Sequence, residues 1–155
     1  MTDGFIGLNF ANDIITLLNG KWKASGGAKP LFQTQWNMKN VGLGSRNYNQ
    51  VIISIDAENP QIYSMMQGDA TDATKFTYDW LHDVSISIDI RTSESELRVM
   101  QLVDEIMRIL KTNVVPTINN RTYIQMLPEG ITSLNEEYRN LYRYLISVSA
   151  IKLNP

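Results

Sequence analysis

Residues able to carry acid–base chemistry are few in this chain. His82 is its single histidine, and it begins a predicted strand without a partner that the sequence identifies. Catalysis by such a side chain needs a nucleophile, a second base or a metal within reach. We therefore interpret His82 as a surface or partly buried residue at the end of a strand.

Three carboxylates, Asp89, Asp104 and Glu105, are the candidates for a hard cation, which takes oxygen ligands. Asp89 is expected on the polar face of its strand, opposite the face that the following helix covers, so convergence with Asp104 is not expected. We interpret all three as solvated or salt-bridged surface charges. Metal-dependent hydrolysis through them is the last of our alternatives.

The remaining routes to catalysis are excluded by composition or spacing. The chain has no cysteine, which excludes a catalytic thiol, a zinc knuckle and a disulfide framework. Gly20-Lys21 and Gly26-Gly27 do not have the spacing of a phosphate-binding loop. We assign no catalytic, metal or cofactor-binding residue, expect no cofactor, and predict that the protein is not an enzyme.

Charge and hydropathy restrict the partners. Fourteen Lys and Arg stand against sixteen Asp and Glu, a formal net charge of −2, so no long-range field attracts nucleic acid and sequence-specific nucleic-acid binding is not expected. No stretch approaches the length needed to span a bilayer, and the N-terminus lacks a signal-peptide pattern. We expect no membrane association and a cytosolic site of synthesis.

An aromatic and basic cluster near the C-terminus is the most informative surface feature. Its composition is typical of protein interfaces and, less often, of stacking platforms for single-stranded nucleic acid, although a core strand with its flanking loop explains it equally well. Methionines at 65, 66, 100, 107 and 126 can likewise form an adaptable surface or fill the core. The cluster comprises Tyr138, Arg139, Tyr142, Arg143 and Tyr144.

The best-specified elements are a strand over residues 82–91 and a helix over residues 93–112. The strand alternates apolar and polar residues, which predicts one buried face. Ser93 and Glu96 have the spacing of a capping box at the start of the helix. The apolar residues of the helix recur at three- and four-residue spacing, so we expect this helix to lie on the sheet. The buried positions are Val84, Ile86, Ile88 and Ile90 in the strand and Val99, Leu102, Val103, Ile106, Ile109 and Leu110 in the helix, with Arg98, Gln101, Glu105 and Arg108 opposite.

The first half of the chain predicts an N-terminal helix and short strands. Asn12 is the expected cap of the helix, with Asp13 in its first turn, and Glu58-Asn59-Pro60 is expected to end a strand. The expected elements are a helix over 12–19, an exposed connector over 24–30, strands over 31–36, 51–56 and 62–67, a long loop over 37–50 and a polar turn over 68–74.

The C-terminal part predicts two further strands. A loop over 114–120 precedes a strand over 122–127, Pro128-Glu129-Gly130 turns the chain, and a polar irregular stretch covers 132–140. The final strand, 141–153, is apolar on much of both faces, so it is either central in the sheet or covered by another subunit. We predict one domain over residues 1–155 of the α+β class, a mostly antiparallel sheet with an N-terminal helix and a longer amphipathic helix packed on one face.

Three segments together resemble a known family. The strand Val84 to Thr92, the helix segment Asp104 to Leu110 and the terminal Tyr142 to Val148, preceded by an N-terminal helix with Trp22 and by Lys29-Pro30, are similar in order and texture to small tail-completion proteins of tailed viruses of bacteria and archaea. Tail terminators are the most similar of these. The resemblance covers most of the chain and is weakest over residues 37–75.

This resemblance implies a non-enzymatic virion subunit that forms a ring with copies of itself, typically a hexamer, at the junction of tail and neck. Such a ring is assembled in the host cytoplasm, caps the tail tube, stops its polymerisation and contacts tube protein on one side and a neck or connector protein on the other. The family has no catalytic residues to transfer. We select interface residues by composition: Tyr138, Arg139, Tyr142, Arg143, Tyr144, Trp36 and Arg46. Arg143 is the most specific of these, because it lies between two tyrosines on a strand that we expect to be covered.

Two alternatives remain beside the terminator. Within the structural class, the chain is a neck or head-to-tail connector subunit. From another class, it is a small-ligand-binding α+β module, since unrelated functions share this architecture. A buried pocket with convergent polar groups would favour the ligand-binding module.

Overall fold

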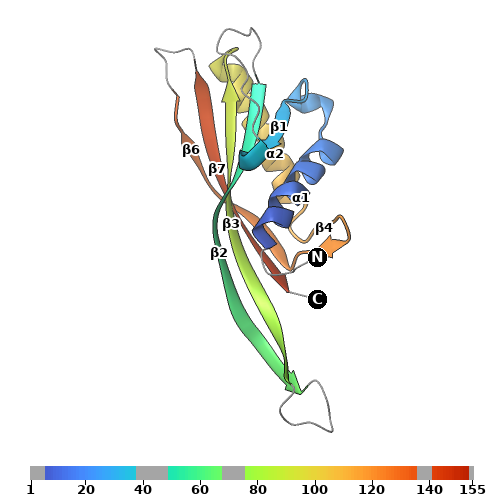
Figure 1. Cartoon of the computed structure of the whole chain (residues 1–155). Coiled ribbons are helices and arrows are strands. Elements are labelled where there is room, and N and C mark those ends of the chain that lie inside the picture. Colours follow the sequence, from blue (N-terminus) through green and yellow to red (C-terminus); the bar gives the residue numbers. More distant parts are fainter. Residues whose placement is uncertain (1–5, 38–48, 68–75, 136–140, 154–155) are drawn as a thin grey trace.

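The computed structural model describes residues 6–37, 49–67, 76–135 and 141–153. It confirms the α+β class: two helices lie on the same side of a five-stranded sheet with the order β1-β2-β3-β7-β6 (Figure 1). β1 is parallel to β2, and the other neighbours are antiparallel. The elements are α1 (Ile6–Lys21), η1 (Ala24–Gly26), β1 (Leu31–Thr34), η2 (Gln35–Asn37), β2 (Asn49–Gln67), β3 (Phe76–Thr92), α2 (Glu96–Thr112), β4 (Thr117–Ile118), β5 (Arg121–Thr122), β6 (Gln125–Ser133) and β7 (Tyr142–Leu153).

The core lies between the helices and one face of the sheet. The four apolar β3 residues at alternating positions from Val84 to Ile90 are at most 1% exposed, and the six apolar positions predicted for α2 are all buried. Both predictions are confirmed. α1 adds a second apolar stripe against β2 and β3, contributed by Phe10, Ala11, Ile14, Leu17 and Leu18.

The terminal strand is central. β7 is hydrogen-bonded to β3 over residues 142–153 and to β6 over residues 144–151. Of the two alternatives for an apolar terminal strand, this structure shows the central position. The opposite face of the sheet has neither helix over it in the part of the chain that is described (Figure 1), and it carries alternating polar residues such as Ser85, Ser87 and Asp89.

The predicted break at residues 58–60 is wrong. β2 runs unbroken from Asn49 to Gln67 and pairs with β3 along its length, with Pro60 opposite His82. β1 pairs with β2 only from Gln50 to Ile53, so β2 is an edge strand at Pro60, and edge strands are where a sheet tolerates proline. Irregularities at Ile55/Ala57 and Ile62/Ser64 bend the strand without ending it.

The predicted turn at residues 128–130 is also wrong. β6 continues through Pro128 to Ser133, with a register shift between Pro128 and Gly130 against β7. One extra residue in an edge strand makes a bulge, which accommodates the proline and the glycine without reversing the chain. The sequence signal that predicts a turn is the same signal that marks a bulge.

Both helices begin elsewhere than predicted. α1 begins at Ile6, so Asn12 is not its cap and Asp13 lies in mid-helix, where it is fully buried. Ser95 and not Ser93 is the N-cap of α2, since its side chain accepts a hydrogen bond from the Arg98 N–H at 3.1 Å. Glu96 is therefore the first residue of the helix, not its third as a capping box with Ser93 would require.

Two expected loops contain regular structure, and one expected strand is shorter than predicted. Residues 114–120 include β4, which pairs with β5 across Asn119 and Asn120, both at positive φ, a conformation that asparagine tolerates. β2 already begins at Asn49, while residues 38–48 of the expected long loop lie outside the described residues, as does the expected turn over 68–74. The expected strand over 31–36 ends at Thr34 and continues as η2.

Candidate subunit-interface surfaces

The polar side of α2 holds the segment after α1, and its Glu105 is salt-bridged to Arg108 but buried, whereas a surface position was predicted. Glu105 is 3% exposed and accepts hydrogen bonds from the Lys23 N–H at 2.9 Å and the Ser25 hydroxyl at 3.0 Å. Hydrogen bonds from Arg108 outweigh burial and lower the pKa of Glu105 from 4.5 to about 2. The segment is thereby fixed to the helix.

Two more contacts complete this attachment. Arg98 donates to the carbonyl oxygens of Gly26 and Ala28, both at 2.6 Å. Gly26 lies so close to α2 that a Cβ there would meet Glu105 Cγ at 2.6 Å and Trp22 Cζ2 at 2.7 Å. The stretch over residues 24–30, predicted as an exposed connector, is exposed at residues 24, 25, 28 and 29 but attached to α2 through Gly26 and its neighbours.

Asp13 ties the small β4–β5 hairpin to α1. Its carboxylate accepts two hydrogen bonds from Arg121 and one each from Asn119 and the Tyr123 hydroxyl. Burial, together with the bond to Asp13, raises the pKa of Tyr123, so the phenol stays protonated. Both oxygens of this buried carboxylate accept hydrogen bonds from within the chain, so the cluster stabilises the packing of the hairpin on α1.

Asp89 and His82 are both buried, whereas Asp89 was predicted as a solvated or salt-bridged surface charge and His82 as a surface or partly buried strand end. Asp89, 6% exposed, accepts a bidentate pair from Arg143 at 2.8 Å and further bonds from Arg91. Burial alone would raise the pKa of Asp89, but these arginine hydrogen bonds lower it overall. His82 lies within β3, with Nδ1 2.9 Å from Glu58 Oε1.

The three candidate metal ligands do not converge. Asp89 lies on the face of the sheet away from the helices, whereas Asp104 and Glu105 lie on α2. Among the residues described, no three acidic, histidine or cysteine side chains are grouped as a metal site would require. No helix in the described part of the chain is long and apolar enough to span a bilayer.

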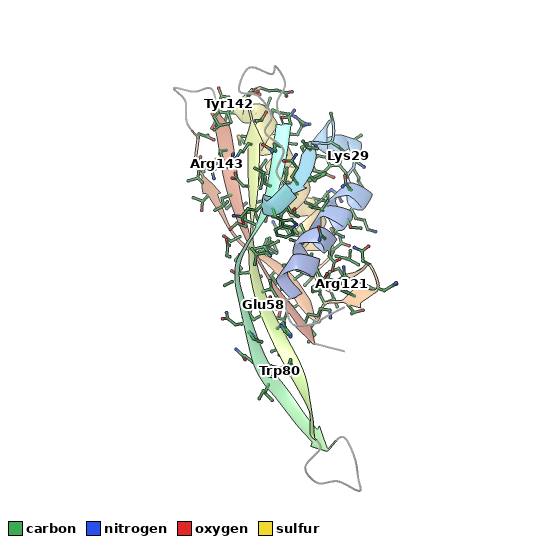
Figure 2. All side chains as sticks on the ribbon, in the orientation of Figure 1. Lys29, Glu58, Trp80, Arg121, Tyr142 and Arg143 are labelled. Atoms are coloured by element: carbon green, nitrogen blue, oxygen red, sulfur yellow. The ribbon has the colours of Figure 1, made fainter. Side chains whose placement is uncertain are left out.

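The predicted interface residues fall into three places. Tyr142 and Tyr144 pack against the core from the helix-side face of β7, while Arg143, on the other face, is bound to Asp89. Trp36 is 43% exposed in η2, at the other edge of the sheet. Figure 2 shows Tyr142 and Arg143 at the end of the sheet opposite Trp80. Tyr138, Arg139 and Arg46 lie outside the described residues.

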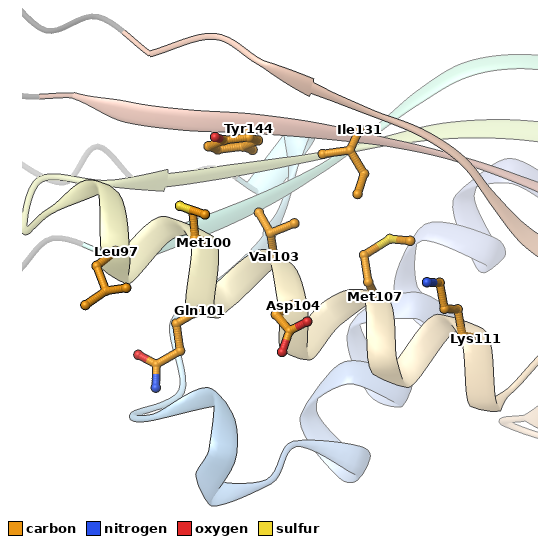
Figure 3. Close-up of a pocket in the computed structure, with 9 residues that line it drawn as sticks. All are labelled: Leu97, Met100, Gln101, Val103, Asp104, Met107, Lys111, Ile131 and Tyr144. Atoms are coloured by element: carbon orange, nitrogen blue, oxygen red, sulfur yellow. The ribbon is translucent and has the colours of Figure 1, made fainter.

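An open apolar groove runs between α2 and the edge of the sheet. Figure 3 shows Met100 and Met107 on the helix pointing toward Tyr144 of β7 and Ile131 of β6, with Leu97 lining the groove at the start of the helix. Its volume is about 580 Å³, and Leu97 and Met100 are 78% and 52% exposed. The polar lining residues, Gln101, Asp104 and Lys111, are all exposed. A site for a small polar ligand has buried polar groups that converge on it, and this groove has none among the residues described.

The sequence contains a signal for this groove beside the buried positions predicted for the helix. Leu97, Met100 and Met107 recur with Asp104 and Lys111 at three- and four-residue spacing, beside the predicted buried stripe. A second apolar row on a helix widens its apolar face beyond what one sheet covers. The exposed apolar residues of β1 and β6 carried no such periodicity, since exposure at a sheet edge depends on strand order.

The exposed apolar side chains gather at the two edges of the sheet. Among the described residues, all the large apolar side chains at least 38% exposed, except Ile62, lie beside β1 or along β6 and the groove. Such clustering marks contact surfaces, whereas single exposed apolar residues do not. Those at the β1 edge are Leu31 and Trp36, and those on the β6 side are Leu97, Met100, Val115, Ile124, Ile131 and Leu134.

A two-stranded arm projects from the body (Figure 1). β3 pairs with β7 only from Leu81 onwards, so its residues 76–80 pair with β2 alone, over residues 62–67. Ile62, 56% exposed, is opposite Trp80 in this ribbon. An isolated two-stranded hairpin is marginally stable in water, so the arm is a second candidate contact surface.

Comparison with known proteins gives a match at the level of fold. A chain of a solved structure described as the virion of a native gene transfer agent particle matches with a TM-score of 0.56, and the match covers 97% of this chain and 100% of that chain. Sequence identity over the match is 12%. No protein-family model and no curated protein matches the sequence. The chain therefore shares its fold, over nearly its full length, with a protein from a phage-like particle.

Proposed function

We propose that this protein is a structural subunit of a tailed phage-like virion, and specifically a tail terminator that forms a ring, typically a hexamer, at the junction of tail and neck. The observation that carries this proposal is the nearly full-length structural match to a chain of a gene transfer agent virion. Its two apolar sheet edges support it further, because a ring needs two different complementary surfaces on each subunit.

The arm supports a contact along the ring axis. It extends the β2 and β3 strands beyond the body (Figure 1), so subunits that meet at the edges of their sheets leave the arm free to reach the next layer of the particle. We propose that it contacts tail tube protein, with a neck protein on the opposite side of the ring. Trp36, beside the β1 edge, and Tyr144, in the lining of the groove, remain proposed interface residues, as do Tyr142 and Arg143 at the end of β7.

Light scattering of the purified protein with negative-stain imaging tests the ring, and imaging of mixtures with tail tubes tests its position. We expect rings that bind one end of a tube. A strictly monomeric protein that neither forms rings nor associates with tubes would contradict the proposal. Cross-linking in intact particles separates a terminator, which touches tube protein, from a connector, which touches the portal side.

The contact of the arm has its own matched pair of variants. Ile62→Asp places a charge on the exposed apolar side chain opposite Trp80, and Gln61→Asp places the same charge at the exposed neighbouring position. We expect both variants to form rings and only Ile62→Asp to lose tube binding, because a charge desolvated in a contact is costly. Equal tube binding by the two variants would remove the arm from the tube contact.

A further inference from the structure

The two edge segments of the sheet, β1 and residues 131–134, lie at the same level along the strand direction. Following the strand register from Thr34 leads across the whole sheet to Ile131, and following it from Leu31 leads to Leu134, whose N–H donates to the Arg143 carbonyl at 2.8 Å. β1 and residues 131–134 are therefore the opposite ends of the same rows. The row from Thr34 passes through Ile53, Ile88 and Ile146 before it reaches Ile131.

The outer sides of both segments are open within the described chain. β1 is the last strand of the sheet on one side and β6 the last on the other. At its beginning β6 is partly covered, since Met126 N–H donates to the Val114 carbonyl at 2.7 Å, but no such bond is recorded for residues 131–133 beyond β7. Unpaired edge strands readily pair with another chain.

The directions of the two edge strands suit a ring. β2 is parallel to β1, β3 is antiparallel to β2, β7 is antiparallel to β3, and β6 is antiparallel to β7. β1 and β6 therefore run in opposite directions. Rotation about an axis parallel to the strands leaves the direction of every strand unchanged and keeps the same face of each sheet toward the outside of the ring. A neighbour placed by such a rotation presents its β1 antiparallel to β6, which is the geometry of a regular ladder.

The apolar side chains also correspond. Leu31 and Leu134 are at opposite ends of one row, on the face away from the helices, and are 45% and 38% exposed. On the helix side, the groove formed by Leu97, Met100 and Ile131 lies beside β6, and Trp36 follows β1 directly. Each exposed cluster at one edge thus has an apolar counterpart at the other.

We infer that the groove beside β6 is occupied by a second copy of this chain, whose β1 adds antiparallel to residues 131–134 of β6 and whose Leu31 and Trp36 cover Leu134 and the groove. The contact is head-to-tail, so its repetition closes a ring or extends a filament. This inference rests on the ring proposed above and names the surfaces that form it.

The absence of cysteine from the sequence makes this register testable by disulfide cross-linking. Opposed residues of an antiparallel ladder have Cα atoms about 4.5–5.5 Å apart, within the range that a disulfide spans. The double variant Leu31→Cys/Leu134→Cys, and its register-shifted companion Leu31→Cys/Thr132→Cys, are oxidised in the assembled state and separated on a denaturing gel. Each single variant is the control.

We expect one double variant to give a ladder of covalent oligomers that ends at the ring size, and the single variants to run as monomers. A wild-type protein that forms rings while neither double variant cross-links would overturn the inference and leave the proposed function standing. A wild-type protein that forms no assembly, alone or on tubes, would overturn the proposed function itself.

A charge in the groove provides an independent measurement. Met100→Glu is expected to raise the concentration for half-assembly by at least about tenfold, because the contact would bury an unpaired charge. Gln61→Glu, which places the same charge at an exposed position of β2 next to the arm, is the matched control and leaves assembly unchanged. Equal assembly by the two variants would contradict occupation of the groove.

Discussion

The two flanks of α2 differ in where their contacts come from. Arg98, Gln101, Glu105 and Arg108 form one flank, and their partners are backbone and side-chain groups of the segment after α1. Leu97, Met100 and Met107 form part of the other flank, and this side faces an open groove. The polar flank has its partners within one chain, whereas Leu97 and Met100 of the apolar flank are exposed.

The difference lies in what each flank contacts: one flank fixes a segment of the same chain, and the other lines an open groove. A helix that covers a sheet needs one apolar stripe, and the opposite surface normally carries charge toward water. Here charged side chains fix a neighbouring segment, and the exposed surface beside the groove carries the apolar residues Leu97 and Met100 among polar ones. Exposed apolar surface at a defined place is typical of a protein that functions in a complex.

The largest expected effect separates the buried stripe from the open flank. Leu102→Ala, at a fully buried position, is expected to lower the free energy of unfolding by about 2–5 kcal/mol, since it removes methyl groups from a packed core. Leu97→Ala, at a 78% exposed position of the same helix, is expected to change it by about 0.5 kcal/mol or less. Urea unfolding at a concentration where the protein is monomeric measures both, and similar losses would mean that Leu97 is packed within the single chain.

The close approach of the segment after α1 predicts the next effect. Gly26→Ala places a Cβ within 3 Å of Glu105 and Trp22, and we expect it to cost about 1–3 kcal/mol through overpacking. Gly20→Ala is the matched control: its Cβ meets nothing within 4 Å, and alanine favours a helix by up to about 1 kcal/mol. A Gly26→Ala protein as stable as wild type would show that this segment is held less closely than described.

Glu105 measures the strength of the polar flank. Glu105→Gln removes the charge that accepts from Arg108 and the segment after α1, and we expect a loss of about 1–3 kcal/mol of unfolding free energy. Asp104→Asn, the exposed neighbour on the other flank, should stay within about 0.5 kcal/mol of wild type. Equal effects of the two substitutions would mean that Glu105 is solvated like Asp104.

The pH dependence gives a smaller effect with a defined sign. The pKa of Glu105 is lowered from 4.5 to about 2 on folding, so its contribution to stability is fully present above pH 4.5 and is lost as the pH falls towards 2. The stability difference between wild type and Glu105→Gln should therefore shrink over this interval. A difference that stays constant between pH 6 and pH 2.5 would contradict the lowered pKa.

The sequence predicted the fold class, the buried positions of β3 and α2 and the two-faced terminal strand, because regular periodicity reports burial directly. Proline and glycine signals were misread: Pro60 and Pro128 lie inside strands, where strand order and not local sequence makes an edge that tolerates them. The burial of Asp13, Asp89 and Glu105 could not be predicted either. Their partners, Arg121, Arg143 and Ser25, are distant in sequence. Only the tertiary fold brings each carboxylate and its partner together.

Methionine oxidation measures the occupation of the apolar flank most directly. Met100 is 52% exposed in the single chain and Met126 is fully buried, so peroxide should oxidise Met100 and spare Met126 in the monomer. In assembled rings we predict that Met100 becomes as protected as Met126. Oxidation of Met100 at the same rate in rings and in monomers would contradict the burial of this flank between subunits.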